Sequence, residues 1–149
     1  MSNYTEEVGE KLNGLLEKTY DAEKGYKKAA ENVEHSGLKS FFNRKAQERY
    51  NFGHELKSEI KSFGQDVDKG GSITGSAHRA WMDVKSLFSN DNAESMLEEA
   101  IRGEKSSVEE YNDVLNETSL PSTTKLLLSK QKQTIESGLS TIERLEDLQ

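Results

Sequence analysis

Three glutamates, Glu23, Glu48 and Glu104, are the residues of this chain whose type and spacing best fit metal chemistry. Each falls on the apolar side of a sequence pattern that is typical of a long amphipathic helix. Carboxylates that converge inside a helical bundle neutralise and bridge the two ions of a di-iron site. The sequence therefore predicts a candidate metal site with these three glutamates as ligands.

The rest of a di-iron ligand set is incomplete in this chain. The pattern requires Glu-x-x-His on each of two helices. Asn51 stands where the histidine after Glu48 is needed, and Gln131 and Thr134 stand where the second motif is needed. Gln131 or His78 would have to complete the shell of an iron or manganese ion. We therefore call the predicted site degenerate and expect no bound cofactor, with iron or manganese as the alternative.

Two interpretations of the glutamates need no metal. In the first, the carboxylates pair with lysines, tyrosine hydroxyls or water in a partly polar core, because a buried carboxylate needs such partners. Tyr26, Tyr50 and Tyr111 are suitably spaced donors for this purpose. In the second, the glutamates lie at the edge of each apolar stripe and reach solvent.

The elements that would position these residues are long helices. Apolar residues recur every three or four positions and predict helices over residues 4–33, 38–63, 93–117 and 122–148. Gly64 is a typical stop at the end of the second. A shorter helix is expected over 76–88, with Trp81 as its anchor. Because the outer links are short and the middle link is long, we expect an all-α, antiparallel four-helix bundle over residues 1–149 with the short helix in its crossover.

Composition narrows the class of protein. The 149 residues are 32% hydrophobic and 32% charged, which fits long helices with one apolar stripe each. There is no cysteine, so disulfides and thiolate metal sites are excluded. The net charge of −7 disfavours nucleic acid and anionic membranes as partners. No apolar stretch approaches the ~20 residues of a membrane helix, and we see no secretory signal, phosphate-binding loop or nucleophile elbow.

A resemblance to a known family is carried by four segments, DAEKGYKKAAENV, LKSFFNRKAQERYNF, GSITGSAHRAWMDVKSLF and EEAIRGEKS. Together they resemble an uncharacterised bacterial family of ferritin-like four-helix-bundle proteins, a domain of unknown function whose members are often associated with stress. The resemblance covers nearly the whole chain. It implies a ferritin-like bundle with His78 and Trp81 in the crossover, and a bacterial cytoplasmic protein. Glu23, Glu48 and Glu104 match the positions of ferritin-like carboxylate ligands.

These observations favour a non-catalytic, stress-associated bundle protein that acts through its surface or by self-association, so its partner would be a second copy or another protein. The alternative is a di-metal carboxylate protein with metal-storage or oxidoreductase activity. A third interpretation is a docking module that uses an exposed strip of the 38–63 helix or the helix around Trp81. We assign no catalytic residue.

Overall fold

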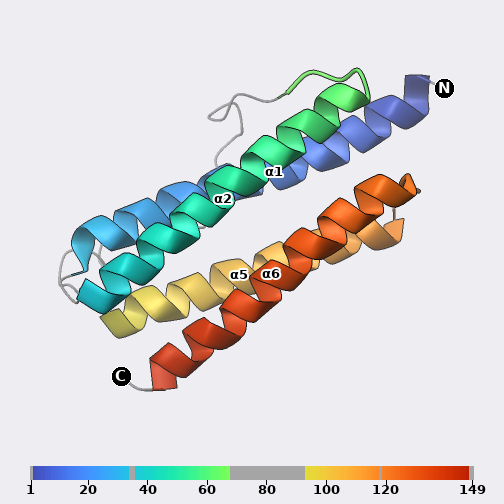
Figure 1. Cartoon of the computed structure of the whole chain (residues 1–149). Coiled ribbons are helices and arrows are strands. Elements are labelled where there is room, and N and C mark those ends of the chain that lie inside the picture. The colour runs from blue at the N-terminus through green and yellow to red at the C-terminus, as the bar shows by residue number, and fades with distance from the viewer. Residues whose placement is uncertain (1, 34–35, 68–92, 118, 148–149) are drawn as a thin grey trace.

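The computed structural model describes residues 2–33, 36–67, 93–117 and 119–147, and within these ranges the chain is helical with no strand (Figure 1). The helices are α1 (Ser2–Asn32), α2 (Ser36–Ser62), α5 (Ala93–Glu117) and α6 (Ser122–Asp147). The all-α prediction is confirmed for this part of the chain. The short helix expected over 76–88, with His78 and Trp81, lies outside the described residues.

The helices pack as two hairpins. α1 packs most closely against α2, and α5 against α6. Figure 1 shows the α1/α2 pair lying beside the α5/α6 pair. None of the described helices is long and apolar enough to cross a membrane.

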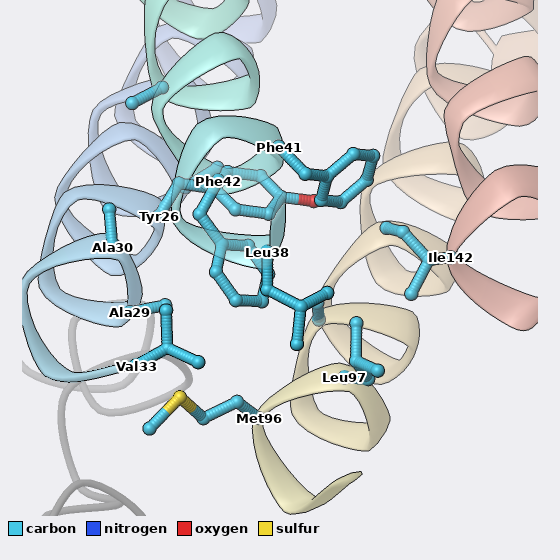
Figure 2. Close-up of a cluster of buried hydrophobic side chains, with 13 residues drawn as sticks. Tyr26, Ala29, Ala30, Val33, Leu38, Phe41, Phe42, Met96, Leu97 and Ile142 are labelled. Atoms are coloured by element: carbon cyan, nitrogen blue, oxygen red, sulfur yellow. The ribbon is translucent and has the colours of Figure 1, made fainter. Parts of the chain in front are cut away.

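One end of the bundle is filled by an apolar cluster from all four helices (Figure 2). It combines the last turns of α1 and α6 with the first turns of α2 and α5, so α1 and α6 end where α2 and α5 begin. Tyr26 and Phe42 lie at its centre, with their ring centroids 6.1 Å apart. The other members include Ala29, Val33, Leu38, Phe41, Met96, Leu97 and Ile142.

The opposite end carries a second apolar cluster. It combines the first turns of α1 and α6 with the last turns of α2 and α5, and its members include Val8, Leu12, Leu15, Leu56, Ile60, Val114, Leu128 and Ile135. Most of these side chains follow the three- and four-residue spacing seen in the sequence, because that spacing keeps one face of a helix directed at the core. Polar side chains occupy the region between the two clusters.

The C-terminal end of α2 is fixed by a Schellman motif. Gly64 has φ of 73°, and its N–H donates to the carbonyl of Lys61 at 2.9 Å, while the N–H of Gln65 donates to the carbonyl of Ile60 at 3.3 Å. Asn13 of α1 then donates a side-chain hydrogen bond of 2.9 Å to the carbonyl of the following residue, Asp66. The end of α2 is thereby tied to the beginning of α1.

Two glycines give a matched test of this backbone geometry. Gly64→Ala should lower the free energy of unfolding by about 1 kcal/mol, because alanine is disfavoured at positive φ. Gly14→Ala should raise it by roughly 0.5–1 kcal/mol, because Gly14 is exposed within α1 and an added Cβ would meet no atom within 4 Å. Urea denaturation of both variants measures the two effects. Equal effects of the two substitutions would contradict the assigned helix end.

Candidate functional site: a buried ion cluster

Glu104 is the predicted carboxylate ligand that lies wholly inside the bundle. It belongs to α5, between the two apolar clusters, and its side chain is 0% exposed. One carboxylate oxygen, Oε1, accepts a hydrogen bond from the guanidinium of Arg49 on α2. The other, Oε2, lies 4.0 Å from the ammonium of Lys45, also on α2. Glu104 is therefore neutralised by cations from the neighbouring hairpin.

Arg49 is the centre of this ion cluster. Its side chain is almost fully buried, and its guanidinium carbon lies 5.9 Å from the ring centroid of Tyr26 and 5.6 Å from that of Phe52. A delocalised guanidinium is suited to such a place, because it stacks on aromatic rings while its N–H groups reach carboxylates. Arg49 also donates to Glu48 at 2.6 Å, so it joins two of the three predicted carboxylates.

Lys45 and Glu48 complete the cluster on α2. The Lys45 ammonium contacts both carboxylate oxygens of Glu48, at 3.1 and 2.8 Å. Lys45 also reaches α6, where a Cβ added at Gly138 would collide with its ammonium nitrogen. The glycine thus leaves space for the end of the lysine. Two cations and two carboxylates balance, so the cluster of Lys45, Glu48, Arg49 and Glu104 carries no net charge.

Glu23 does not join this cluster. It forms an ion pair of 2.9 Å with Lys27, one turn further along α1, and its side chain is 15% exposed. It lines a groove between α1 and α2 together with Tyr50. The predicted convergence of the three glutamates is therefore not what the structure shows. Glu48 and Glu104 share cations, whereas Glu23 lies at the edge of its stripe.

A metal ion does not fit the residues that surround Glu104. Over residues 2–33, 36–67, 93–117 and 119–147, no group of three or more histidine, cysteine, aspartate or glutamate side chains is placed to hold one. The positive charge that the carboxylates require comes from Arg49 and Lys45, which leaves the ion no electrostatic role beside Glu104. His78, the other predicted ligand, lies outside the described part of the chain.

Gln131, proposed as a ligand, has both ends of its amide engaged. Its carbonyl oxygen accepts a hydrogen bond of 2.6 Å from the hydroxyl of Tyr111 on α5, and its NH2 donates to Glu55 on α2 at 2.8 Å. Gln131 itself belongs to α6, so this second polar layer joins three helices. A buried amide with both groups paired stabilises the core at that level and has no oxygen directed at Glu104.

Asn51 and Thr134, which occupy ligand positions of the di-iron pattern, face outward. Asn51 is exposed and accepts a side-chain hydrogen bond of 3.1 Å from Gln47. Thr134 is exposed and donates to the carbonyl of Lys130, four residues earlier on α6, at 3.0 Å. Neither residue belongs to the buried ion cluster.

Lys45 and Arg49 are the site residues that the sequence pattern did not lead us to predict. They belong to a row that steps by four and three along α2, and every member of this row is buried: Leu38, Phe42, Lys45, Arg49, Phe52 and Leu56. Two basic residues in an otherwise apolar row are therefore the sequence signal that could have identified Lys45 and Arg49 as buried site residues. The prediction put Glu48 on that face instead, although Glu48 precedes Arg49 by about 100° of helix rotation.

Burial and the nearby charges shift the pKa values of this site. Burial raises the pKa of Tyr26 well above its ordinary value, and the neighbouring Glu104 raises it further. Burial likewise raises the pKa of Tyr111. For Arg49, burial alone lowers the pKa, but Glu104, with Tyr26 and Glu48, outweighs it and raises the pKa above the ordinary value. The guanidinium is therefore held in its charged form.

Breaking the central ion pair should be strongly destabilising. Arg49→Met and Glu104→Met should each lower the free energy of unfolding by about 3–5 kcal/mol, because each leaves a buried charge with one partner fewer. The double variant should recover much of that loss, because two unbranched apolar side chains then face one another. Chemical denaturation of the four species gives the coupling energy.

The exposed pair of Arg102 and Glu99 on α5 is the matched control for that cycle. The Arg102 side chain is 56% exposed, and exposed ion pairs contribute only about 0–1 kcal/mol. Arg102→Met and Glu99→Met should therefore have small and nearly additive effects. Additive losses in the Arg49 and Glu104 variants would show that the buried pair is not coupled.

Alkaline pH should weaken the fold through its buried tyrosines. The phenols of Tyr26 and Tyr111 ionise near pH 10 in the unfolded chain but only at higher pH in the folded protein. The stability that they contribute is complete below pH 10 and is lost as the pH rises above it, by roughly 1.4 kcal/mol per pH unit for each tyrosine. Urea denaturation between pH 8 and 11 should show this slope.

Removing either phenol tests that assignment. Tyr26→Phe and Tyr111→Phe should each reduce the slope above pH 10 by about 1.4 kcal/mol per pH unit. Below pH 9 the free energy of unfolding of each variant should depend on pH as that of the parent protein does. The lost hydroxyl changes this free energy only by a constant amount. An unchanged slope in both variants would mean that neither phenol is held neutral by burial.

Comparison with known proteins places the chain in a family. The family model described as "Domain of unknown function (DUF2383)" matches residues 7–117, which take in most of α1, all of α2 and α5, and the whole ion cluster. α6, with Gln131, follows the matched range. No curated protein matches the chain. Because the match covers most of its length, the chain belongs to this family.

Proposed function

We propose that this member of the DUF2383 family is a non-catalytic four-helix-bundle protein whose core carboxylates are neutralised by the chain's own cations. It would act through its surface or by self-association, in keeping with the stress association that the sequence resemblance implies. The observation that carries the proposal is the buried contact between the Arg49 guanidinium and Glu104. A protein cation at the centre of the carboxylate site supplies the charge that an iron or manganese ion would otherwise supply.

The chemistry of the cluster also argues against a catalytic role. A general acid or base works when its pKa lies near the operating pH. Arg49 stays charged and Tyr26 stays neutral over that range, because their pKa values are raised away from it. Both side chains instead stabilise the packing of the α1/α2 hairpin against α5.

We further propose that the bundle has ferritin-like topology. In support, α2 and α5 begin at the same end of the bundle, as the shared apolar cluster of Leu38 and Leu97 indicates. The end of α2 and the beginning of α5 therefore lie at opposite ends of the bundle. Antiparallel hairpins with one long crossover are the arrangement of ferritin-like folds. The short crossover helix over 76–88 remains part of this proposal.

The sequence supports a proposal for the partners and the location of the protein. The net charge of −7 argues against nucleic acid, so we propose a second copy or another protein as the partner. The family resemblance, with its stress association, supports a bacterial cytoplasmic protein. Analytical ultracentrifugation over a hundredfold range of concentration would test self-association directly.

Metal loading tests the metal-free core. Protein purified without chelator, and the same protein after anaerobic Fe(II) loading and desalting, should both contain iron only at background. Millimolar Mn(II) should leave the melting temperature unchanged, because only a ligand that binds the folded state raises it. Arg49→Ala is the informative variant, since removal of the guanidinium is the change that would open Glu48 and Glu104 to an added cation.

Stoichiometric iron in the protein would contradict the proposal. About two irons per chain in the parent protein, lost in Glu23→Ala and Glu104→Ala, would establish a metal site and overturn the proposal. Iron retained in those two variants would instead indicate adsorption to the acidic surface.

A further inference from the structure

A groove of about 380 Å³ between α1 and α2 lies outside the ion cluster. Its lining combines apolar surface with polar groups, and besides Ala46 it consists of five larger side chains from the two helices: Glu23, Lys27, Asn43, Gln47 and Tyr50. The volume falls within the range of about 300–1,000 Å³ that is usual for small-molecule sites. The side chains that line the groove indicate which class of ligand it could bind.

Glu23 provides the negative charge of the groove. Its carboxylate is only 15% exposed, whereas its partner, Lys27, is 60% exposed. An ion pair with so exposed a lysine contributes little, about 0–1 kcal/mol. A second ammonium group can therefore replace Lys27 at Glu23 at little cost.

Tyr50 provides an aromatic wall. Tyr50 is 48% exposed, and its ring lies nearly perpendicular to that of His54, with ring centroids 4.6 Å apart. A braced aromatic ring attracts cations to its face and offers an apolar surface to methylene groups. This wall favours a ligand that is both cationic and partly aliphatic.

Two amides complete the lining on α2. Asn43 and Gln47 are four residues apart and therefore share one face of the helix. Gln47 donates from its NH2 to Asn51 at 3.1 Å, and its carbonyl oxygen is a hydrogen-bond acceptor. A carboxylate, an amide oxygen and a ring face together suit an N–H donor with positive charge.

We propose that this groove binds a small aliphatic organic cation with primary ammonium groups, of the diamine or polyamine class. One ammonium group displaces Lys27 from Glu23, and the methylene chain lies over the ring of Tyr50. The net charge of −7 raises the local concentration of such cations. The site goes beyond the proposed function and uses no residue of the buried ion cluster.

Calorimetric titration with spermidine at low ionic strength tests the proposal. Glu23→Gln should weaken binding by roughly two- to fivefold, because it removes the carboxylate that pairs with the ammonium group. Tyr50→Ala should weaken it by roughly two- to fivefold, as expected for an exposed cation–π contact, and Tyr50→Phe should retain affinity. Lys27→Gln should tighten binding, because it removes the competing ammonium.

Glu99→Gln is the matched control. Glu99 is 17% exposed and pairs with the basic Arg102 on its own helix, as Glu23 does with Lys27, but it lies on α5. This variant should bind spermidine as the parent protein does. Equal weakening in Glu99→Gln and Glu23→Gln would show general attraction to an acidic surface and overturn the site, as would the absence of binding at millimolar spermidine. Either result would leave the iron-loading outcome unaffected, so the two proposals fail separately.

Discussion

The burial of one carboxylate is the constraint on which this bundle depends. Glu104 is 0% exposed, and an ionised carboxylate without a partner in such a place would cost several kcal/mol. Arg49 and Lys45 offset part of that cost, but only if α2 lies against α5 at one level. The ion cluster thus specifies the position of one hairpin along the other more sharply than apolar contacts can.

The two apolar clusters could tolerate other positions of one hairpin along the other. The charged groups between the clusters tolerate such shifts less readily. A shift of one hairpin by one helical turn, about 5.4 Å, would still place apolar side chains opposite one another in many positions. It would also leave Arg49 without its carboxylate, and a shift toward the end of α2 would place Glu104 beside Phe52. The polar layer of Tyr111, Gln131 and Glu55 imposes the same requirement between α5, α6 and α2. Buried polar groups of this kind exclude alternatives because each must be paired.

The sequence predicted the helices well and the site only in part. Periodicity placed all four described helices to within two residues at each end, and Gly64 was identified as the stop after α2. The burial of Glu104 also followed from its place between Ile101 and Val108. These features are local, so the spacing of apolar residues along one helix was sufficient to predict them.

What the sequence could not decide was which of two adjacent charged residues on α2 faces the core. Glu48 and Arg49 differ by about 100° of rotation, and apolar neighbours lie within one turn of both. The prediction favoured Glu48 because it lies seven residues after Phe41 and four before Phe52. Only the approach of Glu104 from α5, 55 residues away, decides in favour of Arg49. Glu23 pairs with Lys27 of its own helix and lies at the edge of its stripe.

The contact between the two hairpins bears on whether a hairpin packs against its own chain or against another molecule. Every copy of the chain presents the same Arg49 and the same Glu104, so the contact chemistry does not distinguish a hairpin of its own chain from that of another molecule. The distinction comes from the covalent connection, which sets a high effective concentration of the chain's own α5/α6 hairpin. Pairing within one molecule therefore depends on the covalent connection between the hairpins. The preference for it over pairing between molecules decreases as the total concentration of protein approaches that effective concentration.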